Sequence, residues 1–196
     1  MPSADLPGLT PEAELPVFTP LGEETIHRGR FLRIQRASFA APDGERFERD
    51  IVRHPGAVAV VPVTAAGGVL LVRQYRPAVD RWLLEIPAGT CDVEGEPHET
   101  TARRELAEEV GCAAEALVPL IRMANTPGFC DEWTSIFLAT GLSPVAHDRH
   151  GAEEVHLEVV EVPLERFDAL VDDGTIVDAQ TVLGVALARR HLPPAG

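Results

Sequence analysis

The chain has 196 residues, of which 45% are hydrophobic, and 31 acidic against 17 basic residues give it a formal net charge of −14. This length suits one globular core with an appended element, and this apolar content excludes a disordered protein. The negative charge repels the phosphate backbone of nucleic acids, and no apolar run approaches the roughly 20 residues that span a bilayer. We therefore expect neither nucleic-acid nor membrane partners.

The sequence also indicates a cytoplasmic location. Its N-terminal stretch lacks the basic and apolar regions of a secretory signal. The three cysteines, Cys91, Cys112 and Cys130, show no CxxC spacing, which argues against a disulfide framework or a zinc site. Free thiols of this kind fit a reducing compartment.

The N-terminal part of the chain divides into an arm and a β element. Residues 1–20 are rich in proline and lack hydrophobic periodicity, which predicts a flexible arm. Alternation of apolar and polar residues from Glu24 to Arg53 predicts two or three strands, with Pro42-Asp43-Gly44 as a turn. So few strands are marginal in water, so we expect residues 21–54 to form an antiparallel β element that packs on a larger partner, with a second subunit as the candidate.

Residues 55–196 are expected to form the main domain. Strands are predicted at 57–63 and 69–74, joined as a hairpin through Thr64–Gly68, and residues 82–89 read as a short strand entering a loop. The hydrophobic pattern of the rest of the chain predicts strands at 117–123, 133–140 and 156–161, a helical region from Leu164, and a closing helix at 179–191. The order β-rich, helix, β-rich, helix predicts an α+β fold, an αβα sandwich with a mixed β-sheet.

A helix is predicted between Pro97, which suits a first helical turn, and Gly111, which suits a C-terminal cap. Its apolar stripe is expected to consist of Ala102, Leu106, Val110 and Ala113.

Three carboxylates of this helix share one face. Glu105, Glu108 and Glu109 stand at i, i+3 and i+4, and like charges so placed repel one another unless a cation lies among them. Hard divalent ions such as Mg²⁺ take oxygen ligands, often carboxylates together with substrate phosphates. By themselves, these three glutamates are compatible with a metal site for phosphate chemistry and equally with a solvated acidic helix face.

The flanking residues decide between these interpretations. Gly89, Glu96 and the stretch Arg104–Cys112 resemble the Nudix box, in which Gly, five residues, Glu and seven residues precede Arg-Glu-U-X-Glu-Glu-X-Gly-U, with U aliphatic. Two departures are visible: six residues separate Gly89 from Glu96, and Cys112 stands at an aliphatic position. An extra loop residue costs little, Cys is a small hydrophobe, and neither departure touches the carboxylates.

Over residues 24–191, the chain resembles bacterial, dimeric ADP-ribose pyrophosphatases. The matching stretches are 72–77 (VRQYRP), 82–89 (WLLEIPAG), 126–132 (TPGFCDE) and the pair 153–154 (EE). That branch also carries a proline about 16 residues beyond the box glycine, and Pro127 has this position relative to Gly111.

The resemblance implies a Nudix-type fold and Mg²⁺- or Mn²⁺-dependent cleavage of a nucleoside diphosphate linked to another group. ADP-ribose would give AMP and ribose 5-phosphate. The implied metal ligands are Glu105, Glu108, Glu109 and the backbone carbonyl of Ala88. Arg104 is expected to orient the glutamates, and Glu96 is either an outer ligand or a charge favoured at the helix N-terminus.

The implied catalytic base lies in a late loop, at Glu153 or Glu154, while Glu109 belongs to the catalytic metal set. Substrate contacts are implied for Arg49, Arg76, Glu85 and Pro127, with Arg49 acting across a homodimer interface. Guanidinium groups suit phosphates by their fork geometry. The residue that stacks on adenine stays open among the aromatic side chains Phe31, Phe47 and Trp82.

Two alternatives remain at this point. One is hydrolysis of another nucleotide sugar, such as a GDP- or UDP-sugar. In the sequence, only Pro127 and the general likeness to ADP-ribose pyrophosphatases favour ADP-ribose over these substrates. The other is a Nudix-type module that binds a nucleotide without cleaving it. Loss of box carboxylates would indicate such a sensor, and all three are present.

Overall fold

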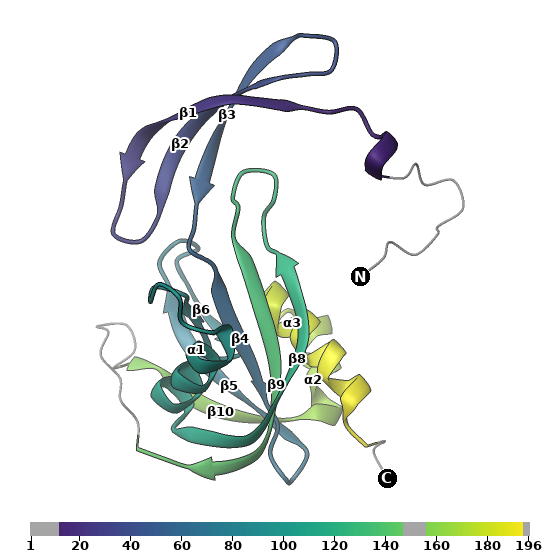
Figure 1. Cartoon of the computed structure of the whole chain (residues 1–196). Helices are drawn as coiled ribbons and strands as arrows, with labels where there is room; N and C mark the ends of the chain where they lie inside the picture. Colours follow the sequence, from purple (N-terminus) through teal and green to yellow (C-terminus); the bar gives the residue numbers. More distant parts are fainter. Residues whose placement is uncertain (1–11, 147–155, 194–196) are drawn as a thin grey trace. The chain divides into compact units, whose positions relative to one another are not determined.

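The structure, a computed structural model, describes residues 12–146 and 156–193 and divides the chain into two units (Figure 1). Of these residues, 12–54 and 126–131 belong to the first unit, and the others belong to the second. The sequence did not indicate that the segment 126–131 joins the N-terminal element.

The first unit is an antiparallel sheet in the order β1 (Thr19–Arg28), β2 (Arg33–Ala40), β3 (Arg46–Arg53), preceded by the short 3₁₀ turn η1 (Glu12–Glu14). The turn between β2 and β3 contains Gly44, whose φ of +89° favours glycine. Within the three strands, only Gln35 and Ala37 are buried. The sheet therefore has almost no apolar core of its own.

The segment 126–131 is tied to the end of β3 by main-chain and charged contacts. The N–H of Val52 donates to the carbonyl of Phe129 at 2.8 Å, and the N–H of Asp131 donates to the carbonyl of Val52 at 3.1 Å. The Asp131 carboxylate accepts from the N–H of His54 at 2.8 Å and pairs with Arg53 at 3.0 Å. These bonds explain why the segment belongs to the first unit.

The second unit contains two sheets. The four-stranded sheet has the order β7 (Ala88–Thr90), β4 (Ala57–Pro62), β9 (Trp133–Pro144), β8 (Cys112–Ala124), and it is mixed because β4 pairs with β9 in parallel. The three-stranded sheet has the order β10 (Glu158–Pro163), β5 (Gly68–Arg76), β6 (Arg81–Glu85) and is antiparallel.

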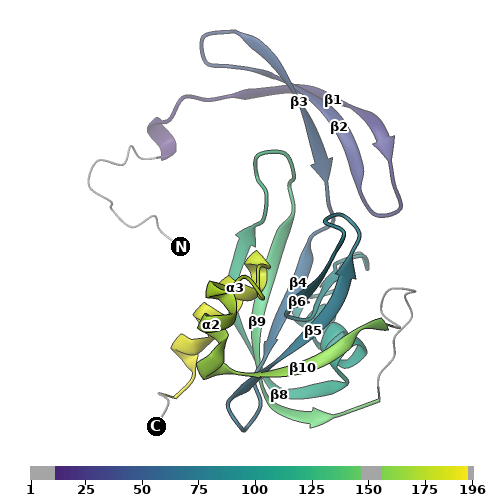
Figure 2. The same ribbon diagram turned by 180° about the vertical axis from the view of Figure 1, so that it is seen from behind.

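Strand β4 is buried along its whole length, because each of its faces packs against a different helix. Val58 and Val60 share a core with the first helix, α1 (His98–Glu105), whereas Ala59 and Val61 share a core with α3 (Ala179–Ala188). Figures 1 and 2 show α1 and α3 on opposite sides of β4 and β9. The predicted αβα sandwich with a mixed sheet is confirmed.

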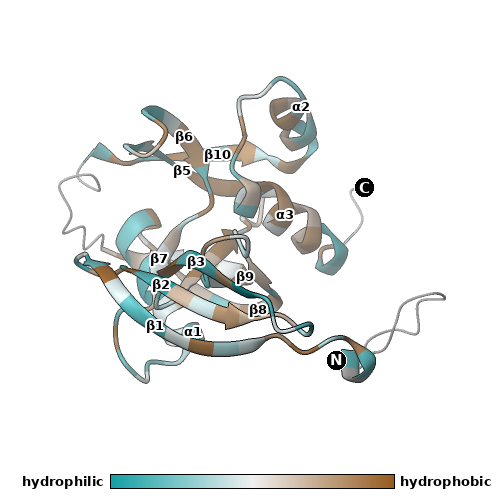
Figure 3. Cartoon of the chain, turned by 90° about the horizontal axis from the view of Figure 1, so that it is seen from above, coloured by the Kyte–Doolittle hydropathy of each residue, from teal (hydrophilic) through white to brown (hydrophobic). Residues whose placement is uncertain are grey.

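The chain closes with a short 3₁₀ turn, η4 (Leu164–Arg166), followed by α2 (Phe167–Asp172), α3 and a last turn, η5 (Arg189–His191). Most of α3 is hydrophobic, as its brown colour in Figure 3 shows. Val185 and Ala188 of this helix are fully buried. In the part of the chain that the structure describes, no helix combines the length and apolarity needed to cross a membrane.

Two details of the predicted elements differ from the structure. The predicted hairpin is confined to its turn, where the N–H of Thr64 donates to the carbonyl of Gly68 at 2.8 Å and Val63 forms an antiparallel bridge with Val69. Beyond this bridge the two strands belong to different sheets, in which β4 pairs with β7 and β9 and β5 pairs with β6 and β10. Ala113 does not extend the helical stripe either, because Gly111 ends the helix in the left-handed conformation (φ +70°) and Ala113 lies in β8.

Candidate functional site

The residues of the predicted box come together between a helix and a loop of the second unit. The helix is α1, which continues as one π-helical turn, η2 (Leu106–Val110). Its stripe of Ala102, Leu106 and Val110 is buried against the sheet. This packing turns Glu105 and Glu109 toward the loop that joins β6 to β7.

Direct contacts join these glutamates to the first residues of β7, where this loop ends. The N–H of Ala88 donates to Glu109 Oε2 at 3.1 Å. A Cβ atom at Gly89 would overlap the carboxyl group of Glu105, so any other residue there would displace that carboxyl group. Glu105 and Glu109 are only 8% and 6% exposed. Two carboxylates and the main chain of residues 88–89 therefore form one compact group.

Arg104 lies among the carboxylates. Its Nη1 atom is 2.8 Å from Glu105 Oε1 and 3.2 Å from Glu108 Oε2, and its Nη2 atom is 3.8 Å from carboxylate oxygens of Asp92 and Glu96. Burial lowers the pKa of Arg104, but the charges of Glu105 and Glu108 outweigh this effect and raise it above the usual value. Arg104 therefore stays protonated and relieves the repulsion that the acidic face would otherwise suffer.

Glu96 has a second partner in the same helix. Its Oε2 atom accepts a hydrogen bond of 2.7 Å from the hydroxyl of Thr101, which is fully buried in α1. Glu96 is thus held at the start of the helix by Thr101 while facing the guanidinium of Arg104.

The donor set fits a hard divalent cation in its chemistry. Glu105, Glu108 and Glu109 supply carboxylate oxygens, the ligand type that Mg²⁺ takes, and Gly89 lets the main chain approach Glu105. The described residues contain no group of three or more His, Cys, Asp or Glu side chains already arranged as a metal cluster. Glu105 and Glu108 pair instead with the guanidinium of Arg104.

Arg76 and Glu85 form an ion pair on neighbouring strands, in which Glu85 is buried and Arg76 is partly exposed. Arg76 Nε donates to Glu85 Oε1 at 3.0 Å and Arg76 Nη2 donates to Oε2 at 2.6 Å. Gln74 Nε2 donates to the same carboxylate at 3.1 Å. Burial lowers the pKa of Arg76, but the bonds and charge of Glu85 outweigh it, with further contributions from Glu109 and Asp178, so the pKa is raised. The field of Glu109 at Arg76 links this pair to the carboxylates of the helix.

The remaining predicted residues lie elsewhere. Arg49 and Pro127 belong to the first unit. The Arg49 guanidinium lies 4.9 Å from the centroid of the Phe47 ring, and its Nη1 atom donates to the carbonyl of Glu48 at 2.7 Å. Glu153 and Glu154 lie outside the described residues.

A cavity of about 870 Å³ lies in another part of the second unit. It is bordered by the turn between β4 and β5, by α2 and by the C-terminal residues, and its lining includes Thr64, Leu142, Asp168 and Arg189. Arg189 is already paired with Asp168 at 2.7 Å. Of the predicted site residues that the structure describes, none lines this cavity.

Two polar residues at the site were not expected from the sequence. The sequence predicted Gln74 only as part of a strand and Thr181 only as part of the closing helix. Thr181 follows Asp178 at the spacing of a helix N-cap, and this signal could have located the helix start. No local signal shows that the Thr181 hydroxyl accepts a 2.9 Å hydrogen bond from the N–H of Ile86.

Comparison with known proteins agrees with this geometry. The model of the NUDIX domain matches residues 53–182. The chain is 38% identical over 165 residues to an ADP-ribose pyrophosphatase of Bacillus subtilis (strain 168), covering 84% of this chain and 89% of that protein. It is likewise 38% identical over 168 residues to an ADP-ribose pyrophosphatase of Mycobacterium tuberculosis (strain ATCC 25618 / H37Rv), covering 86% and 81%.

A solved structure supports the same assignment. The crystal structure of an ADP compounds hydrolase superposes with a TM-score of 0.78 at 27% identity, over 89% of this chain and 94% of that one. A mixed sheet between helices, with a helix that presents Glu105 and Glu109 to Ala88 and Gly89 at the start of β7, defines a Nudix pyrophosphohydrolase. The chain belongs to the Nudix family, whose hydrolases generally use divalent metal ions.

Proposed function

We propose that this Nudix enzyme hydrolyses the pyrophosphate bond of ADP-ribose, giving AMP and ribose 5-phosphate, with Mg²⁺ as the working ion and Mn²⁺ as a substitute. The observation that carries the proposal is the contact of Glu105 and Glu109 with residues 88–89, beside the Arg76–Glu85 pair. The names of the two pyrophosphatases at 38% identity support ADP-ribose over other nucleotide sugars.

In this proposal Glu105, Glu108, Glu109 and the carbonyl of Ala88 hold the ion. When bound, the ion stabilises negative charge on the pyrophosphate oxygens and lowers the pKa of a water. Arg104 keeps Glu105 and Glu108 oriented, and the burial of Glu105 and Glu109 keeps their charges poorly screened by solvent.

The proposal assigns substrate contacts to four residues. Arg76 contacts the phosphates, and the Glu85 carboxylate accepts a hydrogen bond from a hydroxyl of the terminal ribose. Since Glu85 has two carboxylate oxygens already bonded to Gln74 and Arg76, its orientation is fixed before substrate binds. Arg49 of a partner subunit contributes a second guanidinium, and Pro127 helps select ADP-ribose.

The catalytic base in the proposal is Glu153 or Glu154. Its carboxylate takes the proton of the attacking water, which adds to one phosphorus atom as the bridging P–O bond breaks. Changing each glutamate separately to glutamine identifies the base, because loss of a general base lowers kcat by about 10²- to 10⁴-fold. The other variant is expected to keep most of the activity.

The test of the substrate is a panel of ADP-ribose, GDP-mannose and UDP-glucose, assayed with Mg²⁺ and with identification of the products. We expect the highest kcat/KM for ADP-ribose, with AMP and ribose 5-phosphate formed in equal amounts. Cleavage of UDP-glucose or GDP-mannose at an equal or higher kcat/KM would refute the assignment. Binding of ADP-ribose without turnover would instead indicate a sensor.

The location and assembly belong to the same proposal. Cys91, Cys112 and Cys130 are free thiols in the structure, which suits the cytoplasm. The sparse core of the three-stranded sheet supports a homodimer in which this sheet packs on a second copy of the chain.

A further inference from the structure

The segment from Glu85 to Gly89 joins β6 to β7, and it is called the Glu85–Gly89 loop below. It carries two groups of the proposed site, the Glu85 side chain and the Ala88 main chain. Its ends pair with β5 and β4, and three further hydrogen bonds hold its backbone. The N–H of Ile86 donates to Thr181 Oγ1 at 2.9 Å, the N–H of Val60 donates to the carbonyl of Pro87 at 2.9 Å, and the N–H of Ala88 donates to Glu109 Oε2 at 3.1 Å. Of these partners, Thr181 is a side chain outside the box and outside the sheet.

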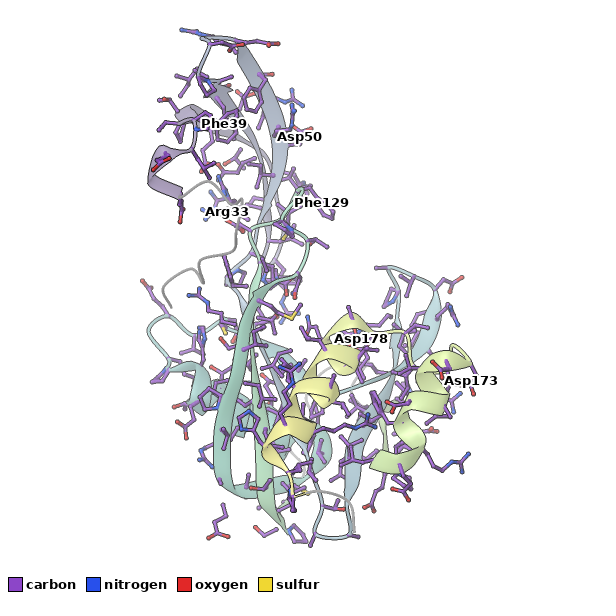
Figure 4. All side chains as sticks on the ribbon, turned by 90° about the vertical axis from the view of Figure 1, so that its right-hand side faces the viewer. Arg33, Phe39, Asp50, Phe129, Asp173 and Asp178 are labelled. Atoms are coloured by element: carbon purple, nitrogen blue, oxygen red, sulfur yellow. The ribbon has the colours of Figure 1, made fainter. Side chains whose placement is uncertain are left out.

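The direction of the Thr181 hydroxyl is fixed by a second partner. Thr181 is fully buried in the first turn of α3, and its hydroxyl donates to Asp178 Oδ2 at 2.7 Å. Asp178, labelled at the start of α3 in Figure 4, also accepts from the N–H of Thr181 at 2.8 Å. Because the hydroxyl hydrogen points to Asp178, an oxygen lone pair remains for the N–H of Ile86.

Helix α3 also contacts the side chain of Ile86. A Cβ atom at Gly184 would lie 3.1 Å from both Ile86 Cδ1 and Val61 Cγ2, so glycine allows the helix to come this close to the loop and sheet. Ile86 is therefore held by α3 through its main chain and through its side chain. A shift of α3 would move the residues on both sides of Ile86, Glu85 and Ala88 among them.

We propose that Thr181 is a positioning residue for the metal and substrate groups of the Glu85–Gly89 loop. Through Ile86 it sets the place of the Ala88 main chain relative to Glu109, and the place of Glu85 relative to Arg76. This inference rests on the proposed function in assigning Ala88 and Glu109 to the ion and Glu85 to the substrate. Residues that orient ligands without touching the ion typically change metal affinity or activity by about 10- to 100-fold when replaced.

The test compares Thr181→Val, which keeps the side-chain shape without the hydroxyl, with Thr181→Ser, which keeps the hydroxyl. Binding of Mn²⁺ to the protein without substrate is followed by the electron paramagnetic resonance signal of free Mn²⁺. We expect the dissociation constant to rise about tenfold in Thr181→Val and to stay within about threefold of wild type in Thr181→Ser. The matched control is Thr134→Val. Thr134 is fully buried in β9, and its hydroxyl accepts from Asn125 Nδ2 at 2.9 Å and from Gln180 Nε2 of α3 at 3.5 Å, so this change affects the same helix but keeps the bond between Thr181 and Ile86.

Hydrogen exchange of the wild-type protein provides a reading that does not depend on how well the variants fold. The amide of Ile86 is expected to be as strongly protected as that of Val60, and Thr181→Val is expected to lower protection at Ile86 and Ala88. Rapid exchange of Ile86 in wild type, unchanged Mn²⁺ affinity in Thr181→Val, or an equal loss in Thr134→Val would overturn the proposal. Because no substrate is present, a failure of the ADP-ribose assignment would leave these readings unaffected.

Discussion

At the scale of single residues, Gly89 shows how the box sequence determines local packing. Its missing side chain leaves room for the Glu105 carboxyl group, which a Cβ atom would overlap. The same kind of contact occurs between Gly68 and Glu161, but Glu161 is exposed and can swing away. Glu105 is buried and paired with Arg104 at 2.8 Å, so it has far less freedom to move.

We therefore expect Gly89→Ala to lower kcat/KM for ADP-ribose by at least about tenfold, because displacement of a positioned group by about 1 Å can cost two orders of magnitude. Gly68→Ala is the matched control, since it also places a methyl group against a glutamate. Its kcat/KM is expected to stay within about twofold of wild type. Equal activity of the two variants would show that the contact of Gly89 with Glu105 has no part in catalysis.

At the scale of elements, the change from α1 to the π-helical turn η2 is the unusual feature. The N–H of Gly111 bonds to the carbonyls of Ala107 and Leu106, and the second bond is of the i→i+5 type. Turns of this type are rare and occur frequently at functional sites. Here the π turn precedes a left-handed Gly111 (φ +70°), and Glu109 within it bonds to Ala88.

Substitution of the glycine that ends this turn tests the element. Gly111→Ala is expected to lower the free energy of unfolding by about 1–2 kcal/mol, the cost of a left-handed conformation for a residue with a Cβ atom. Urea denaturation measures the difference. Gly128→Ala is the control, because no atom lies within 4 Å of its added Cβ and its φ is not positive. Similar losses in both variants would contradict the role of the left-handed cap.

Local patterns predicted this helix and its glutamates well, because helix caps and the 3.6-residue period act over short distances. They also predicted the turn at Thr64–Gly68, but not that the strands on either side of it join different sheets, where β4 pairs with β9 and β5 with β10. They also missed Thr181, which lies 95 residues from its partner Ile86. Contacts of this kind depend on the packing of α3 against the sheet, and no short segment encodes them.

At the scale of the whole molecule, the three-stranded sheet of the first unit is the part least explained by the single chain. Every residue of β1 is exposed, including Leu21 and Ile26, which are 45% and 48% exposed. Phe18 is also exposed and meets Phe47 edge to face. Apolar groups on a sheet without a core are typical of a surface that another chain covers.

We expect sedimentation equilibrium to give about twice the chain mass of 21.2 kDa, because burial of these apolar groups stabilises a homodimer. The double substitution Leu21→Glu and Ile26→Glu is expected to shift the equilibrium toward monomer. Glu24→Lys, an exposed change on the same strand, is the control and is expected to leave the dimer intact. A wild-type chain that sediments as a monomer would refute the dimer.

The most direct test of the central claim is AMP release from ADP-ribose by Glu109→Gln at increasing Mg²⁺ concentrations. The substitution keeps the shape of the side chain but removes a charged metal ligand. Because charge stabilisation by a bound metal is worth several kcal/mol and each 1.36 kcal/mol is a factor of ten in rate, we predict a loss of about 100-fold or more in kcat. Glu99→Gln, an exposed change in the same helix, is expected to keep wild-type activity. Full activity of Glu109→Gln would contradict the account.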